Sequence, residues 1–404
     1  MDLKDRLFWI AKEDEIKRAN TTDIYFIHTV NALRKSGIDP RVVMEVYVRE
    51  LPYPENWAIA TGIYEVAKLL EGLPVNVMAM DEGEVFLAFR GSAIYEPILQ
   101  IEGKYTDIAI FETAILGLLT TSTSVSTKAA RLRLISDGKL LFSFGTRRAH
   151  PALAPTIERA TYIAGFDGVS NVLGANLIGK RPVGTMPHAL ILSFEDQREA
   201  WRAFDKTLPE DVPRIALIDT LFDEKIEAIM ALEALGKKLY GVRLDTPRSR
   251  RGDFRKIIEE VRWELNIRGG ENVKIFASGA IDEDTILKVR DLVDGFGIGT
   301  CVSNPPAIDF SMKIVQVELD GKVNFKAKRG DLGGKKQVYR NEELFEDIVT
   351  LASKLPPEKG KPLLTPLIEN GKIVRNFKGI DEIRSSVLLK LNKLKNVQPK
   401  LKWV

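Results

Sequence analysis

The sequence predicts an α/β protein in which an irregular (β/α) barrel is joined to an additional α+β sandwich domain. Short apolar strands alternate with helix-like segments between residues 140 and 299, and these strands are apolar on both faces. The segments on either side, 20–103 and 306–374, mix strands and helices without that rhythm. Strands that are apolar on both faces indicate a parallel sheet covered by helices. An irregular mixture indicates an α+β domain.

We expect the first region, residues 1–112, to be the α+β domain. Asn20 to Asp23 are helix-capping residue types, and the apolar spacing after them predicts a helix that ends near Gly37. A strand is expected from Val42, a helix from Asn56, and then strands as far as Gly103.

Residues 113–304 are expected to form the barrel. A mostly helical segment, residues 107–139, is expected across the start of this region. The expected strands are 140–145, 168–172, 188–194, 214–219, 239–245, 273–279 and 295–299, with helices between most of them. This count favours a barrel with somewhat fewer than eight regular units, and an open sheet is the alternative.

Residues 305–404 are expected either to complete the N-terminal domain or to form a small third domain. Asp320-Gly321 and Asn370-Gly371 are hairpin turn signals, and a helix is expected over about 381–394.

The amino-acid composition argues against several classes of protein. The 59 basic and 56 acidic residues nearly balance at a net charge of +3, which argues against a nucleic-acid-binding protein. The single cysteine, Cys301, excludes an internal disulfide and a multi-cysteine structural zinc site. No apolar run approaches the roughly 18 residues of a membrane span, and the charged N-terminus lacks a signal-peptide pattern. We therefore expect a cytoplasmic protein without membrane partners.

Polar residues and glycines are expected just after each strand of the barrel, where such folds carry their active sites. They are Arg147, Arg148, Asp167, His188, Asp219, Arg243, Asp245, Ser278, Gly279, Gly297, Gly299 and Thr300. Individually, Asp and Ser can be helix caps and Gly can serve a turn. Seven strand ends in succession favour a binding site.

The residue types suit a phosphorylated, hydroxylated substrate. Glycine-rich strand ends leave backbone N–H groups open to a phosphate. Asp219 and Asp245 could hold Mg²⁺ or accept hydrogen bonds from a ribose diol. Arg243 and Asp245 are two apart in a strand, so they point to the same side. His188 is a candidate catalytic residue because it stands among these groups.

The motifs TTDIYF, FSFGTRRAHP, GFDGVSN, GTMPHA, LIDT, VRLDTP, FASG, GFGIGT and KKQVYR occur in this order between about residues 20 and 340. Together they resemble the nicotinate phosphoribosyltransferases, in particular the archaeal type, of the type II phosphoribosyltransferase superfamily. The resemblance implies transfer of phosphoribose from phosphoribosyl pyrophosphate to nicotinate, with Mg²⁺, in NAD biosynthesis. It also implies a homodimer with shared active sites, or a trimer of such dimers, and no structural zinc in this chain.

The resemblance implies a role for each matching residue. Tyr25, contributed by the second subunit, and Phe144 would sandwich the pyridine ring, Arg147 would meet the nicotinate carboxylate, and Asp167 would orient the base. Arg243, Asp245 and Asp219 would hold the pyrophosphate, ribose and Mg²⁺. The 5-phosphate would lie against Gly279, Gly297, Gly299 and Thr300. His188 matches a histidine that some relatives phosphorylate with ATP.

Other functions stay open at this point. Quinolinate phosphoribosyltransferase is the main alternative, although such enzymes are shorter and surround their dicarboxylate with more Arg and Lys. A nicotinamide-specific enzyme is compatible with Asp167, but two adjacent arginines favour a carboxylate. A barrel lyase or aldolase would need a Schiff-base lysine or a dedicated base at a strand end. A metabolite-binding barrel without catalysis is the last alternative.

Overall fold

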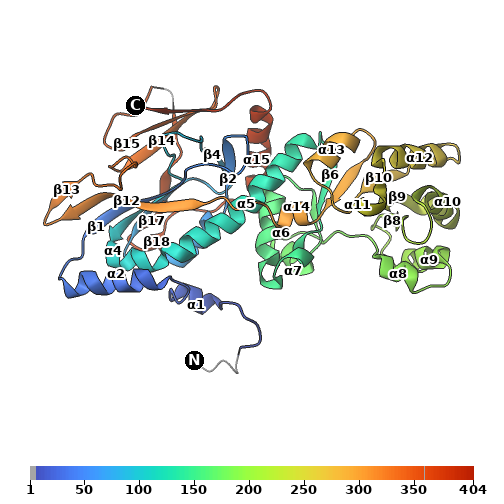
Figure 1. The fold of residues 1–404 in the computed structure, drawn as a ribbon, viewed down its shortest axis with the longest axis horizontal. Coiled ribbons are helices and arrows are strands. Elements are labelled where there is room, and N and C mark those ends of the chain that lie inside the picture. Colours follow the sequence, from blue (N-terminus) through green and yellow to red (C-terminus); the bar gives the residue numbers. More distant parts are fainter. Residues whose placement is uncertain (1–5, 359) are drawn as a thin grey trace. The chain divides into compact units, whose positions relative to one another are not determined.

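The computed structural model describes residues 6–358 and 360–404, which form two compact units (Figure 1). Unit 1 contains the described residues up to Thr127 and from Pro306 onward, and unit 2 contains Lys128–Pro305. The boundary falls within α5 (Glu112–Ile135). The mixed α/β class predicted from the sequence is confirmed.

Unit 1 is built around a seven-stranded sheet with the order β13-β12-β1-β5-β3-β17-β18. Its strands are β1 (Arg41–Val48), β3 (Asn76–Ala79), β5 (Leu99–Lys104), β12 (Phe310–Leu319), β13 (Lys322–Asn324), β17 (Thr365–Glu369) and β18 (Lys372–Ile373). All pairs are antiparallel, and the three strands from the N-terminal part of the chain lie together in the middle of the sheet, with strands from the C-terminal part on both sides. The two predicted Gly-turn hairpins, β12–β13 and β17–β18, are confirmed.

The rest of unit 1 packs around this sheet. A four-stranded sheet consists of β14 (Lys336–Asn341), β15 (Glu346–Leu351), β16 (Lys361–Pro362) and β19 (Lys400–Trp403), and a pair consists of β2 (Trp57–Ala60) and β4 (Glu84–Leu87). The helices are α1 (Glu13–Lys17), α2 (Ile24–Lys35), α3 (Ile63–Leu70), α4 (Tyr105–Ile108) and α15 (Ile380–Leu394), with a 3₁₀ turn at Ala109–Phe111. The predicted helix from Asn56 is wrong over its first turn, because residues 57–60 pair with β4 and are buried on both faces.

Unit 2 contains a six-stranded sheet with the order β7-β6-β11-β10-β9-β8, in which every pair is parallel. The strands are β6 (Leu140–Ser143), β7 (Gly168–Val169), β8 (Arg214–Leu217), β9 (Leu239–Leu244), β10 (Lys274–Ala277) and β11 (Gly295–Ile298). Strands β7 and β8 are the two edges and do not pair with each other, so the described strands form a half-barrel rather than a closed barrel. Parallel strands place all their carboxyl ends at one edge of the sheet.

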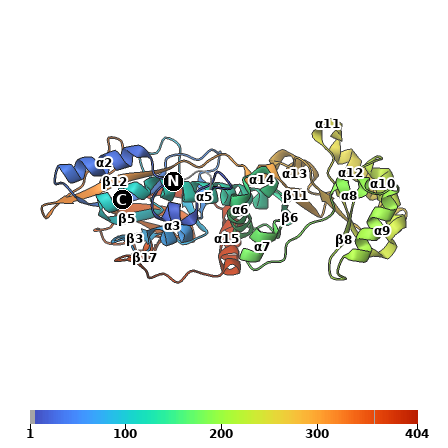
Figure 2. The same ribbon diagram turned by 90° about the horizontal axis from the view of Figure 1, so that it is seen from below.

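Helices cover the half-barrel. They are α6 (Ala154–Ile163), α7 (Val172–Leu177), α8 (His188–Leu192), α9 (Gln197–Thr207), α10 (Glu224–Leu235), α11 (Arg248–Arg251), α12 (Phe254–Asn266), α13 (Glu283–Val289) and α14 (Thr300–Ser303), with 3₁₀ turns at Thr146–Arg148, Pro151–Leu153 and Gly236–Lys238. Helix α10 packs against α9 and α12, as Figures 1 and 2 both show. Asx side chains fix several helix starts by capping; Asp223 accepts from the N–H of Ile226, and Asp282 from that of Thr285.

The predicted strand at 188–194 is wrong, because these residues form the short helix α8. A short apolar run does not distinguish strand from helix by periodicity. Here Pro187 occupies the N-cap position with an extended backbone, and only Ile191 of the five helical residues is buried. The half-barrel therefore has six strands among the described residues rather than the seven expected.

One segment, Tyr105–Ile135, is long and apolar enough to span a membrane by length and composition alone. More than half of its most apolar window is buried within the protein. This burial is also what a core helix of a soluble fold shows, so the segment is weak support for a span.

Candidate active site

A cavity of about 890 Å³ lies at the carboxyl ends of the unit 2 strands. It brings together eleven of the predicted site residues, which come from four different strand ends and from α8. They are Phe144, Arg147, Arg148, His188, Arg243, Asp245, Ser278, Gly279, Gly297, Gly299 and Thr300. The sequence-based expectation that the strand ends converge is therefore met for these residues.

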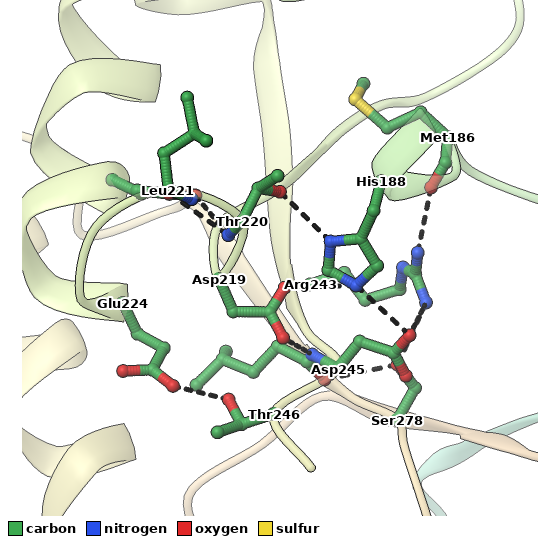
Figure 3. Close-up of polar contacts among 12 residues, drawn as sticks. Met186, His188, Asp219, Thr220, Leu221, Glu224, Arg243, Asp245, Thr246 and Ser278 are labelled. Carbon is green, nitrogen blue, oxygen red and sulfur yellow. Dashed lines mark hydrogen bonds and ion pairs between the residues drawn. The ribbon is translucent and has the colours of Figure 1, made fainter. Parts of the chain in front are cut away.

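The centre of the site is formed by Arg243, Asp245 and Ser278 (Figure 3). Arg243 is buried in β9 and donates from Nη1 to Ser278 Oγ at 3.0 Å and from Nη2 to the carbonyl of Met186 at 2.8 Å. The hydroxyl of Ser278 lies 2.8 Å from Asp245 Oδ1, and Asp245 Oδ2 lies 3.6 Å from Arg243 Nη1. Among the described residues, the buried Nε of Arg243 has no hydrogen-bond partner.

His188 lies at the start of α8 beside this centre. Its Nδ1 is 3.1 Å from Thr220 Oγ1, and its Nε2 is 3.6 Å from Asp245 Oδ2 and 3.9 Å from Asp219 Oδ1 (Figure 3). The imidazole therefore has one normal hydrogen bond and faces two carboxylates at longer distances. This position agrees with the sequence-based interpretation of His188 as part of the site.

Asp219 lies behind His188 and Asp245 at the end of β8, and its side chain is 3% exposed. Its Oδ2 accepts from the N–H of Asp245 at 2.9 Å, whereas its buried Oδ1 has no hydrogen-bond partner in the described part of the chain. Burial, together with the nearby charge of Asp245, raises the pKa of Asp219 to about 7. The site thus holds a carboxyl that titrates near neutrality.

This pKa predicts a pH effect on stability. Because the pKa of Asp219 in the folded chain, about 7, exceeds its usual value of 3.8, the folded state binds more protons and loses stability as pH rises through about 7. In metal-free protein, Asp219→Asn is expected to raise the free energy of unfolding at pH 9 by at most about 4 kcal/mol and to change it little at pH 4. Urea denaturation at both pH values measures this. An equal effect at both would contradict the raised pKa.

Glycines lie at the strand ends next to the cavity. Gly279 has a φ of +75°, and a Cβ there would lie 2.6 Å from the carbonyl oxygen of Asp245. A Cβ on Gly297 would lie 2.3 Å from the ring of Phe144, and one on Gly145 would lie 2.7 Å from the carbonyl of Gly299. Side chains at these positions would collide with their neighbours. Close packing therefore requires glycine at these three positions, whereas a Cβ on Gly299 would have no neighbour closer than 3.8 Å, so Gly299 is the one with open space for a phosphate.

Gly279→Ala is expected to destabilise unit 2 and to lower kcat/KM, because the methyl group would displace Asp245 as well as strain the backbone. Gly269→Ala is the matched control: its φ is +78°, but no atom lies within 4 Å of the added Cβ. It is expected to cost only the left-handed backbone strain, about 1–2 kcal/mol, with kcat/KM retained. Calorimetry and steady-state kinetics compare the two variants. Equal losses of stability and of kcat/KM in both would contradict the close packing at Gly279.

Three predicted or implied positions, Tyr25, Asp167 and Asp219, are not among the described residues that line the cavity. Asp167 lies one residue before β7, at the amino edge of the sheet, where its Oδ2 accepts from Arg133 and from the N–H of Leu141. The prediction that it follows a strand is wrong, and it is not one of the described residues that line the cavity. Tyr25 lies on α2 of unit 1, exposed and in ring contact with Phe26, so its contribution to a shared site stays a prediction.

Sequence reasoning missed several cavity residues. Ser170 and the segment 184–187 line it, and Cys301 lies beside Thr300 with the pKa of its thiol raised to about 11 by burial. Ser170 and residues 184–187 belong to the motifs GFDGVSN and GTMPHA, but neither motif by itself assigned them a role in the site. Only the fold brings them to the cavity.

The predicted Mg²⁺ site can be compared with the oxygen atoms that the structure offers as ligands. Asp219 and Asp245 offer oxygen atoms, which Mg²⁺ prefers, and one of these atoms is buried without a partner. Over residues 6–358 and 360–404, no group of three or more His, Cys, Asp or Glu side chains is placed to hold a metal. Two carboxylates fit a Mg²⁺ that takes its other ligands from water and substrate phosphates.

Known proteins match both the chain and its fold. The family models described as the N-terminal and C-terminal domains of quinolinate phosphoribosyl transferase match residues 23–123 and 125–313. A nicotinate phosphoribosyltransferase of Mycobacterium tuberculosis is 30% identical over 392 residues, covering 88% of this chain and 82% of that protein. The Bacillus subtilis nicotinate phosphoribosyltransferase is 27% identical over 364 residues, covering 79% and 72%.

Two solved structures also match this chain in fold. The crystal structure of nicotinate-nucleotide pyrophosphorylase from Pyrococcus furiosus matches with a TM-score of 0.92 and 50% identity, over 96% of this chain and 99% of that one. Human nicotinic acid phosphoribosyltransferase, at 22% identity and a TM-score of 0.72 over 92% and 94% of the chains, shares the fold. Fold, site and relatives thus define a phosphoribosyltransferase enzyme. The chain belongs to the nicotinate phosphoribosyltransferase family.

Proposed function

We propose that this chain transfers phosphoribose from phosphoribosyl pyrophosphate to nicotinate, giving nicotinate mononucleotide and pyrophosphate for NAD biosynthesis. The observation that carries the proposal is the cluster of Arg243, Asp245 and Ser278 in the cavity, next to the glycines at the ends of β10 and β11. Arginine is suited to pyrophosphate because its planar fork donates two hydrogen bonds in parallel.

The cations around the cavity favour a base with one carboxylate. Four arginines line it, namely Arg147, Arg148, Arg243 and Arg248, and no lysine is among the described residues that do so. Arg243 is engaged at the centre, and Arg248 pairs with Asp282. Arg147 and Arg148 are adjacent and serve one carboxylate, as nicotinate requires. Quinolinate, which carries two, is the alternative, and the descriptions of the matching family models support it.

The reaction needs no protein nucleophile. The lone pair of the pyridine nitrogen forms the bond to C1 of the ribose, while the bond from C1 to the pyrophosphate oxygen breaks and its electrons leave with pyrophosphate. Arg243 neutralises charge on the leaving group. Asp245 and Asp219 would hold Mg²⁺, which stabilises that same negative charge when bound. The negative charge of Asp245 also favours the positive charge that develops on the sugar.

We also propose a homodimer in which Tyr25 of one subunit completes the site of the other by stacking on the pyridine ring against Phe144. A trimer of dimers is an extension of the same proposal, and the archaeal type stays a prediction. Exposed aromatic area on Tyr25 supports this role, since a stacked base would cover it. Cytoplasmic location remains a prediction.

The test is product formation from phosphoribosyl pyrophosphate and Mg²⁺ with nicotinate, nicotinamide and quinolinate in parallel, each with and without ATP. Turnover of nicotinate alone is the expected result. Release of CO₂ from quinolinate would keep the fold and pocket but overturn the substrate. No turnover with any base would favour a metabolite-binding protein.

His188→Ala is expected to remove any stimulation of nicotinate turnover by ATP, because the imidazole is the one group in the cavity that the family resemblance links to phosphorylation. Initial rates with and without ATP measure this. His150→Ala, which changes a histidine outside the residues lining the cavity, is the control. Persistence of the stimulation in His188→Ala would exclude His188 from the coupling.

A further inference from the structure

The loop between β8 and α10 has an unusual support. The side chains of Leu221 and Phe222 are 50% and 57% exposed, so they do not anchor the loop by packing. The backbone N–H groups of residues 220, 221 and 222 instead all donate to the carboxylate of Glu227, at 2.5 to 3.1 Å. Glu227 belongs to α10 and is fully buried. This carboxylate therefore determines the backbone path of the loop.

The same loop orients His188. Thr220 Oγ1 is 3.1 Å from His188 Nδ1, while the distances from Nε2 to the carboxylates of Asp245 and Asp219 are 3.6 and 3.9 Å. The threonine hydroxyl can donate to Nδ1 or accept from it. Its position sets the plane of the ring, while the carboxylates that face Nε2 favour the tautomer with the proton on Nε2, in which Nδ1 accepts from the threonine hydroxyl.

We infer that Glu227 is a positioning residue, which acts through Thr220 to hold the imidazole of His188 in one orientation and one tautomer. A carboxylate accepts from three N–H groups at once, whereas an amide would turn its NH₂ group against at least one of them. Glu227→Gln should therefore release the loop and free Thr220 to move. The inference rests on the proposed function only for its kinetic consequence.

The chain offers a matched control. Glu158 of α6 is also a buried glutamate, and its Oε1 accepts from the N–H groups of Ser170 and Asn171 in the loop after β7, at 3.2 and 2.9 Å. It thus supports the loop at the opposite edge of the sheet and has no bond to Thr220 or His188 among its described contacts. Glu158→Gln makes the same chemical change without the connection to His188.

The experiment is ¹⁵N NMR of the histidine side chains in the full chain. Only three histidines are present, and His188→Gln assigns the signal of His188. In the native protein we expect one tautomer of His188 to dominate. In Glu227→Gln and in Thr220→Val we expect a shift toward a mixture of both tautomers, and in Glu158→Gln no shift. We expect kcat of Glu227→Gln with nicotinate to fall on the order of tenfold to a hundredfold.

Each outcome decides the inference. The inference would be overturned if the tautomer of His188 were unchanged in Glu227→Gln, including the case in which only Thr220→Val shifts it. The same tautomer shift in Glu158→Gln would also overturn it. Should Glu227→Gln not fold, Glu227→Asp, which withdraws the carboxylate by one methylene, is expected to give the same shift. Because the NMR result needs no turnover, a tautomer shift in a protein that does not use nicotinate would sustain this inference and overturn the proposed function.

Discussion

Asp245→Ala is expected to lower kcat by about a hundredfold to a thousandfold while unit 2 stays folded. The carboxylate lies 3.6 Å from both Arg243 Nη1 and His188 Nε2 and accepts from Ser278 Oγ. Its loss would remove a ligand for Mg²⁺ and the acceptor that orients the buried arginine. Single-turnover kinetics with phosphoribosyl pyrophosphate and nicotinate measure the chemical step, and far-ultraviolet circular dichroism verifies the fold.

The matched control is Asp294→Ala. Asp294 accepts from the N–H of Ile275 and lies one residue before β11, at the amino edge of the same sheet. It is expected to keep its kcat, since it is far along the strand from the carboxyl edge. Unchanged turnover in Asp245→Ala would show that the cavity does not carry the reaction.

Arg340→Met is expected to destabilise unit 1 by about 3–5 kcal/mol at neutral pH. Arg340 is fully buried and donates to Asp347 Oδ1 and Glu84 Oε1, both at 2.7 Å, and to the carbonyl of Val85 at 2.7 Å. Methionine would leave the buried carboxyl of Asp347 without its cation and would leave that of Glu84 paired with Lys390 alone. Burial and nearby Asp347 already hold the pKa of Glu96 well above its usual value, so a third carboxyl adds to the cost.

Hydrogen exchange of peptides covering 336–351 reports the local free energy of opening in unit 1. Arg41→Met is the control, because the Arg41–Glu102 pair is partly exposed, and such pairs contribute at most about 1 kcal/mol. If both variants exchange equally, Arg340 does not hold the core of unit 1. The cost of Arg340→Met should also shrink at low pH, where the carboxyls take up protons.

Local rules predicted much of the fold. The Asp320-Gly321 and Asn370-Gly371 turns have positive φ at both residues, the conformation that hairpin turns of this kind require. The alternation of side chains along β9 predicted that Arg243 and Asp245 face the same side, and they lie 3.6 Å apart. These features depend on neighbours in sequence, so the sequence alone determined them.

Long-range contacts decided the rest. Residues 57–60 are a strand because β4 pairs with them, and residues 188–192 are a helix although both segments are short and apolar. Asp167 stands at the amino edge because β7 is only two residues long and begins after it. The bond from Thr220 to His188 and the support from Glu227 join segments that carry no common motif. Such contacts depend on which strand ends and loops the tertiary structure brings together, and no local pattern encodes them.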